Sequence, residues 1–365
     1  MGDVPARIGK YTVERSLGSG GMGEVFLAYS PAGSPVAVKV IRSDLLDAQA
    51  RARFEREAQI AATMIGSNRV ARFLEADPFA AQPWLAMEYV QGCTLLQYVN
   101  EQGVLPLPLT VSLGALVAEG LEAVHAAGLL HRDLKPQNIM LGANGPMIID
   151  FGLSAFVDAS QDSLSRSGTI IGTVRCMPPE QASGNPRVTA AADVYALGTV
   201  LLYAATGHYP YDGTQVPAIV AQVVNPLVRP DLSGVPARLL PLLESMFADD
   251  PDARPATVDV AVACAALLAG AAITPVEARL LLIARTTGTA GPGPALTPSI
   301  EARLNALEEL EGEELEVGPL DVPPEAPEPA EPEPASSGVP AQRRQSASAR
   351  VAQQLRLDYA VHTTL

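Results

Sequence analysis

The chain has 365 residues, of which 48% are hydrophobic and 18% charged, so it can bury one large core or two smaller ones. Its formal net charge of −15 argues against nucleic-acid binding, and twelve of the acidic residues lie between Glu301 and Glu333. Three cysteines, Cys93, Cys176 and Cys264, stand far apart without a C-x-x-C spacing, which argues against a disulfide framework or a zinc site.

No segment of the sequence is predicted to span a membrane. The first sixteen residues lack the apolar core of a signal peptide, and Ala6 stands where a myristoylation signal needs Ser or Thr. The most apolar run, from Val258 to Ile273, is too short to cross a bilayer and contains Asp259, so it predicts a buried helix. We therefore expect a cytoplasmic protein.

Strand-like segments come first along the chain, and helical patterns follow after about residue 92. Apolar runs and alternation predict strands in "YTVERSL", "GEVFLAYS", "PVAVKVI" and "WLAMEYV". A domain boundary is expected near residues 270 to 290, where a Gly/Pro/Thr linker begins. Beyond it, "VPPEAPEPAEPEPASSGVP" alternates Pro and Glu and cannot form a packed core, so this tail is expected to be extended and mobile.

A glycine-rich segment, "LGSGGMGEVFLA", places Gly18, Gly20 and Gly23 between two strand-like segments. An ordinary glycine-rich hairpin turn is the alternative interpretation. In a dinucleotide-binding fold these glycines would open a helix, whereas here a strand continues. The context favours a flap whose backbone amides lie over phosphates, with Val25 packed against a base.

Lys39 lies in the middle of the apolar strand "VAVKVI", where an ammonium group is costly unless it is paired. Glu57, on the helical stretch "RFEREAQIA", is a candidate partner. Such a pair would hold the ammonium where it can reach the phosphates of a nucleotide. A lysine that reaches solvent from an edge strand is the alternative.

The segment "HRDLKPQN" carries a carboxylate, an ammonium and an amide within six residues, namely Asp133, Lys135 and Asn138. These groups suit a base, a charge stabiliser and a metal ligand. Asp150 follows twelve residues after Asn138, at the end of an apolar strand, and a carboxylate there suits a divalent cation with oxygen ligands. A polar loop without function is the alternative, but the apolar strand patterns on both sides do not favour it.

In their order and spacing these motifs resemble the eukaryotic-type, or Hanks-type, Ser/Thr protein kinases, and "GSGGMGEVFLA" and "FEREAQIAA" are similar to the bacterial members. The resemblance covers about residues 8 to 270 and implies an α+β, two-lobed fold. Residues 8–90 would form an N-lobe with an antiparallel sheet and one helix, and residues 91–270 a mostly helical C-lobe. Residues 271–365 would be a linker and an acidic, largely disordered Pro/Glu-rich tail.

The resemblance also implies roles for individual residues. Lys39 with Glu57 would position ATP, Asp133 would be the catalytic base, and Lys135 would meet the γ-phosphoryl group and mark Ser/Thr specificity. Two of the chain's three lysines thus fall where the family uses lysine for chemistry. Asn138 and Asp150 would bind Mg²⁺, with Mn²⁺ possible. The ATP site would be completed by Leu17, Gly18, Ser19, Gly20, Gly21, Met22, Gly23, Val25, Ala37, the gatekeeper Met87, Glu88 and Val90.

Structural and regulatory roles follow in the same way. Glu180 would pair with Arg254, and Asp193 would anchor the catalytic loop. Arg132 would help to form a positive pocket for a phosphate on the loop after Asp150. The candidate phosphorylation sites in that loop are Ser163, Ser165, Ser167 and Thr169.

The expected activity is transfer of the ATP γ-phosphoryl group to Ser or Thr of proteins, including the kinase itself. A nucleotide-binding pseudokinase that displays its acidic tail, and a small-molecule kinase of related fold, are the alternatives. The expected partners are protein substrates and neither nucleic acid nor a membrane span, while the sequence identifies no partner for the tail. Pro178, where relatives commonly carry Ser or Ala, lies beside the expected peptide pocket and leaves peptide preference open.

Overall fold

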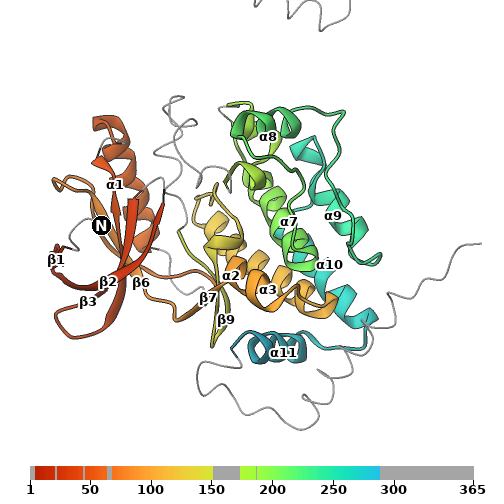
Figure 1. The fold of residues 1–365 in the computed structure, drawn as a ribbon, viewed down its shortest axis with the longest axis horizontal. Helices are drawn as coiled ribbons and strands as arrows, with labels where there is room; N and C mark the ends of the chain where they lie inside the picture. The colour runs from red at the N-terminus through yellow and green to blue at the C-terminus, as the bar shows by residue number, and fades with distance from the viewer. Residues whose placement is uncertain are drawn as a thin grey trace, which may run out of the picture. The chain divides into compact units, whose positions relative to one another are not determined.

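The computed structural model describes residues 5–20, 23–43, 46–63, 68–150, 173–185 and 187–287. Within these residues the chain forms an N-terminal sheet with one helix and a C-terminal group of helices with a small second sheet (Figure 1). This is the two-lobed α+β architecture that the sequence predicts. The predicted acidic tail lies outside the described residues.

The N-lobe sheet has six antiparallel strands in the order β1-β2-β3-β4-β6-β5. All four strands predicted from the alternation are confirmed, because a period of two residues places successive side chains on opposite faces of the sheet. The strands are β1 (Arg7–Ile8), β2 (Tyr11–Gly20), β3 (Gly23–Tyr29), β4 (Pro35–Ile41), β5 (Phe73–Asp77) and β6 (Trp84–Glu88).

Helix α1 (Ala48–Thr63) packs on one face of this sheet and leaves the other face to a second apolar cluster. Phe54 of α1 is 1% exposed and belongs to the same cluster as Leu85 and Met87 of β6. The second cluster includes Val38 and Trp84, which point the opposite way along the same strands. The two faces are therefore separated by the strand period alone.

The C-lobe is built around two helices, α3 (Leu107–Ala126) and α7 (Ala190–Thr206), which pack on each other and supply much of the main core. A three-stranded sheet in the order β7-β8-β9 lies beside them. Its strands are β7 (Gly92–Thr94), β8 (Ile139–Gly142) and β9 (Gly145–Ile148). The remaining helices are α2 (Leu95–Gln102), α6 (Pro179–Ala182), α8 (Val216–Val223), α9 (Leu240–Met246), α10 (Thr257–Gly270) and α11 (Pro275–Thr287), with short 3-10 turns η2 (Pro136–Asn138) and η4 (Pro251–Ala253).

The apolar helices of this lobe were compared with the length and composition that a membrane span requires. Within the described residues α3 alone meets these requirements as one helix, and 67% of its apolar window is buried inside the protein. Helices α10 and α11 meet the test only together, and they are bent by 90° at the break between them. Core helices of globular proteins commonly pass such a test, so it is weak evidence for a span.

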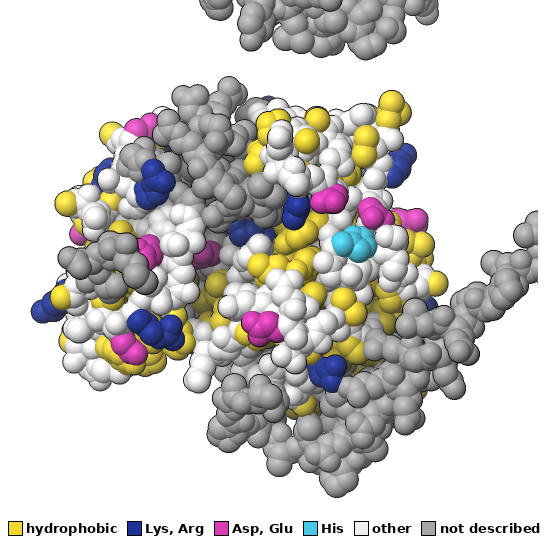
Figure 2. Space-filling model, viewed as in Figure 1, with side chains coloured by type: hydrophobic (Ala, Val, Ile, Leu, Met, Phe, Trp, Pro, Cys, Tyr) yellow, Lys and Arg dark blue, Asp and Glu magenta, His cyan; other side chains and the backbone are white. Residues whose placement is uncertain are grey.

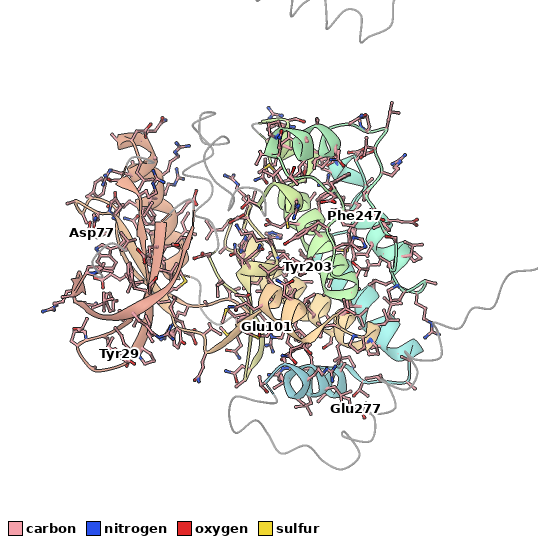
Figure 3. The ribbon with its side chains drawn as sticks, in the orientation of Figure 1. Tyr29, Asp77, Glu101, Tyr203, Phe247 and Glu277 are labelled. Carbon is pink, nitrogen blue, oxygen red and sulfur yellow. The ribbon has the colours of Figure 1, made fainter. Side chains whose placement is uncertain are left out.

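The described residues extend to 287, past the predicted end of the kinase domain at residue 270 and within the boundary region predicted at residues 270 to 290. Residues 275–287, which the sequence analysis assigned to the linker, form helix α11. Thr274 and Glu277 form a reciprocal cap at its start, because the Glu277 amide donates to Thr274 Oγ1 and the Thr274 amide donates to Glu277 Oε2. Figure 3 labels Glu277 on this helix. Leu281 and Leu282 of α11 are fully buried. This apolar face, which composition did not reveal, makes α11 part of the lobe.

Candidate active site

The β2–β3 hairpin carries the predicted phosphate flap. Gly20 and Gly23 face each other across the strand pair, and Leu17 to Gly20 are exposed. At Gly23 the backbone has φ of +154°, and a Cβ there would lie 1.8 Å from Val40 O, so only glycine fits. Gly21 and Met22, between them, lie outside the described residues. The hairpin leaves its exposed backbone free to approach a ligand.

The predicted adenine-site residues gather on the sheet face that α1 also covers. Val25 stands opposite Lys39 in the β3–β4 register, and Ala37 stands opposite Met87 in the β4–β6 register. Cross-strand partners share a face, so these four side chains point the same way. Val90 follows β6, and its backbone groups form no backbone hydrogen bond with the described residues. The Glu88 amide, by contrast, already donates to Arg72 O at 2.8 Å.

Lys39 is paired, but with a different carboxylate from the one predicted. Its Nζ lies 2.8 Å from Asp150 Oδ2, and both side chains are largely buried. Among the described residues no ion pair joins Lys39 to Glu57. Burial raises the pKa of Glu57, against the opposing pull of Arg132 and Arg53. Helix α1 thus presents Glu57 toward arginine side chains, and the predicted Lys39–Glu57 pair is absent from this conformation.

The catalytic-loop residues converge on Asp133. Lys135 Nζ donates to both carboxylate oxygens of Asp133, at 2.9 and 2.8 Å, and to Thr173 Oγ1 at 2.7 Å. Asn138 Nδ2 donates to Asp133 O at 2.8 Å. A carboxylate and an ammonium of this loop therefore lie in direct contact with a hydroxyl. The hydroxyl belongs to Thr173, 38 residues after Lys135 in the chain.

Asp193 holds the backbone of this loop from helix α7. It is 1% exposed, and its carboxylate accepts hydrogen bonds from the amides of His131 and Arg132 and from His125 Nε2. Burial alone would raise the pKa of Asp193, but the bonds from His125 and His131 outweigh it and lower that pKa. The backbone of Arg132 has φ of 60°, a strained value for this residue type, which the Asp193 contact helps to hold.

Two histidines that the sequence reasoning did not single out support the site. His125 reaches Asp193 from α3, and His131 is fully buried. His131 Nδ1 accepts from the Asp133 amide at 3.3 Å, and its Nε2 lies 3.2 Å from Ile149 O. A neutral imidazole with its proton on Nε2 satisfies both contacts, and burial lowers the pKa of His131. For His131 the sequence offered one signal, because this histidine is the first residue of the "HRD" motif at residues 131–133.

Asn138 and Asp150 fit a divalent metal by their chemistry. Asn138 uses its amide nitrogen to bind Asp133 O, and Asp150 uses Oδ2 to bind Lys39, so within the described residues each keeps one oxygen outside these bonds. The backbone joins the two segments, because the Ile149 amide donates to Asn138 O at 2.9 Å. Burial opposes the charged form of Asp150, but Lys39 outweighs it and lowers the pKa, so the carboxylate is ionised and suited to a cation.

These two residues do not form a larger cluster of metal-binding side chains. No group of three or more His, Cys, Asp or Glu residues that could hold a metal occurs in the described part of the chain. A Mg²⁺ ion, which keeps several waters and binds through a few protein oxygens plus substrate phosphates, suits such a sparse site.

Arg254 contacts its predicted partner, Glu180, which lies 74 residues earlier in the chain. Arg254 Nη1 and Nη2 donate to Glu180 Oε1 and Oε2 at 2.7 and 2.9 Å. The Arg254 side chain is completely buried, and its guanidinium also lies over the Tyr195 ring at 5.0 Å. The candidate phosphorylation sites Ser163, Ser165, Ser167 and Thr169 lie outside the described residues.

Comparison with known proteins agrees with this geometry. The protein kinase domain family matches residues 11–264. The chain is 44% identical over 257 residues to the probable serine/threonine-protein kinase PkwA of Thermomonospora curvata, covering 70% of this chain and 34% of the relative. It is 43% identical over 259 residues to the serine/threonine-protein kinase AfsK of Streptomyces coelicolor, covering 70% and 32%. The chain thus spans about a third of the length of the curated relatives it matches.

The solved structures give the same result for the fold. The PknI kinase domain of Mycobacterium tuberculosis superposes with a TM-score of 0.56 at 30% identity, over 71% of this chain and 96% of that one. Sequence motifs, fold and site geometry agree, and the chain belongs to the protein kinase domain family, in the bacterial branch of the Hanks-type Ser/Thr kinases.

Proposed function

We propose that the chain is a protein kinase that transfers the γ-phosphoryl group of ATP to Ser or Thr hydroxyls of proteins. The observation that carries the proposal is the buried contact of Lys135 with both Asp133 and Thr173. In this contact a carboxylate suited to act as the base lies beside an ammonium that can neutralise charge developing on a phosphoryl group. The hydroxyl of Thr173 accepts a further hydrogen bond from Lys135.

In the reaction, the substrate hydroxyl oxygen bonds to the γ-phosphorus while the bond to the β–γ bridging oxygen breaks and ADP leaves. Asp133 orients the hydroxyl and accepts its proton, and Lys135 stabilises the charge on the transferred group. Lys39 contacts the nucleotide phosphates. Asn138 and Asp150 would hold a divalent metal, for which we propose Mg²⁺ over Mn²⁺, and that ion would supply charge neutralisation for the phosphates. The cytoplasm supplies ATP and is the proposed location.

A direct test uses purified protein with labelled ATP, Mg²⁺ and a generic protein substrate. We expect label on Ser and Thr of the substrate, and none with Asp133→Asn, which keeps the size of the side chain but cannot accept the proton. Repeating the assay with Mn²⁺ compares the two metals. Nucleotide binding without any transfer by the parent protein would instead identify a nucleotide-binding scaffold.

We also propose autophosphorylation in the loop after Asp150, at one or more of Ser163, Ser165, Ser167 and Thr169. Arg132 supports it, because an arginine next to the base can receive a phosphate and order the segment that holds peptide. Peptide mapping by mass spectrometry, with rates before and after phosphatase treatment, tests this step. We expect phosphate within residues 163–169 and a lower rate once it is removed. An unphosphorylated loop in fully active protein would contradict it.

The face drawn in Figure 2 bears on the expectation that nucleic acid is not a partner. On the face drawn in Figure 2 the described Lys and Arg side chains lie as separate groups with acidic side chains among them. A nucleic-acid site would require a basic patch or stripe. The described residues on this face therefore show no basic patch of that kind.

A further inference from the structure

Helix α11 lies beyond residue 264, where the match to the kinase family ends, and yet it is built into the C-lobe. Its residues Ala278, Leu281 and Leu282 are 0% exposed. The helix packs against α3, β8, β9 and α10, and Figure 1 shows it beside α3. A helix with this much buried apolar surface is held firmly to the elements that it touches.

The β8–β9 hairpin, which packs against α11, has the two candidate metal ligands at its open end, opposite its turn. Strand β8 begins directly after Asn138, and β9 ends two residues before Asp150. Ile139 pairs with Ile148 across the hairpin, and the Ile149 amide donates to Asn138 O. A shift of this hairpin must therefore move both ligands.

The turn of the hairpin is held by two arginines. Arg279 Nη2 of α11 donates to Asn144 O at 3.2 Å, and Arg69 Nη1 donates to the same oxygen at 2.8 Å. Ile283 of α11 also lies near this turn, since a Cβ added at Gly145 would lie 3.7 Å from its side chain. The turn is thus fixed from the N-terminal side by Arg69 and from α11 by Arg279.

The two guanidinium groups repel each other. Burial lowers the pKa of Arg69, and the charge of Arg279 lowers it further. Two positive charges that share the Asn144 carbonyl oxygen repel each other, so the pair adds less to folding stability than two separate contacts would. Removal of Arg279 should therefore cost little folding stability, so an effect on position can be separated from an effect on folding.

We propose that Arg279 is a positioning residue for the metal site: through Asn144 it fixes the β8–β9 hairpin and with it the relative placement of Asn138 and Asp150. The inference rests on one part of the proposed function, namely that Asn138 and Asp150 hold the metal. It extends the kinase machinery to a helix outside the family match. Partners of a metal ligand influence metal affinity even when they never touch the ion.

The test compares Arg279→Ala, Arg279→Lys and the matched control Val276→Ala in the full chain, because Val276 lies on the same helix but is 68% exposed. Mn²⁺ binding is measured by electron paramagnetic resonance in the presence of a non-hydrolysable ATP analogue, alongside the unfolding midpoint without ligand. We expect Arg279→Ala to weaken Mn²⁺ binding about 3- to 10-fold, less than the roughly 10- to 100-fold loss for a direct partner of a ligand. Arg279→Lys should bind within about two-fold of the parent, because lysine can still donate to Asn144 O.

Kinetics give a second readout. The Mg²⁺ concentration for half-maximal transfer should rise in Arg279→Ala by the same factor, with the KM for peptide unchanged. Unchanged Mn²⁺ binding in Arg279→Ala overturns the proposal, and so does a loss that Val276→Ala shares. If the parent binds Mn²⁺ with nucleotide but transfers no phosphoryl group, the proposed function fails while the binding comparison still decides the role of Arg279.

Discussion

Lys39 and Asp150, 111 residues apart in the chain, form a 2.8 Å ion pair that joins strand β4 of the N-lobe to the end of the β8–β9 hairpin. The ammonium that is predicted to position ATP thus contacts the carboxylate that is predicted to bind the metal. Neither charge is far exposed, so each would be costly without the other. The pair preorganises two groups that are predicted to act on the same phosphates.

Lys39→Arg should leave the protein folded and remove phosphoryl transfer. Arginine keeps the charge, but its planar fork is larger and does not replace a compact ammonium in a buried slot. We expect kcat/KM to fall by about 100-fold or more. Lys10→Arg is the matched control, because Lys10 pairs with Glu75 on the surface. Activity of Lys39→Arg within a few-fold of the parent would show that Lys39 does not position ATP.

Glu57→Gln should affect stability and activity in opposite directions. Burial raises the folded-state pKa of Glu57, so ionisation of Glu57 costs stability once the pH exceeds its unfolded pKa, and the full cost is present above the folded pKa. The variant should therefore unfold at a higher temperature than the parent at pH 7, with the difference lost near pH 4. Its transfer activity should fall if Glu57 pairs with Lys39 during turnover. Glu55→Gln, exposed on the same helix, should change neither property.

Asp193→Asn should destabilise the protein most at neutral pH. The pKa of Asp193 is lowered in the folded state, because bonds from His125 and His131 outweigh burial. Its contribution is present above the unfolded pKa of about 3.9 and is lost as the pH falls through the lower folded value. We expect a loss of roughly 2–4 kcal/mol at pH 7 that shrinks below pH 4, measured by urea unfolding. An equal loss at pH 7 and pH 3 would contradict it, and Asp259→Asn, on the exposed side of α10, is the control.

Arg254→Ala should cost about 3–5 kcal/mol, because it leaves the buried carboxylate of Glu180 without its partner. Arg229→Ala is the matched control, since Arg229 meets Asp249 at 3.5 Å with a side chain that is 79% exposed, and it should cost less than about 1 kcal/mol. Denaturant unfolding of both variants checks the difference. Similar losses would mean that the Glu180–Arg254 pair is not a buried structural link.

Two deletions separate the tail from helix α11. Removal of residues 290–365 should leave the unfolding midpoint nearly unchanged, because a Pro/Glu run buries little apolar surface. Removal of residues 271–365 also deletes α11 and its buried leucines, and should lower the midpoint clearly. A clear drop in the unfolding midpoint after removal of residues 290–365 would show that the tail binds the kinase domain and stabilises it.

The sequence also contains a local signal for the start of helix α11. "TPVE" at residues 274–277 has a capping threonine, a proline in the first turn and a glutamate three residues on, which together predict a helix start. The apolar run after it supplied the buried face. Local rules therefore predict this helix directly before the Gly/Pro-rich linker.

The sequence by itself determined four of the six strands of the N-lobe, the family and the order of the chemical groups from Lys39 to Asp150. Strand period, glycine positions and motif spacing are local properties, and local sterics and patterning fix them. Only the tertiary structure decided which carboxylate pairs with Lys39, since Asp150 and Glu57 both satisfy the charge rule and only packing of α1 against the sheet separates them. Only tertiary structure could bring Arg279 and Arg69 onto one carbonyl oxygen, because segments 210 residues apart meet through buried surface and not through sequence pattern.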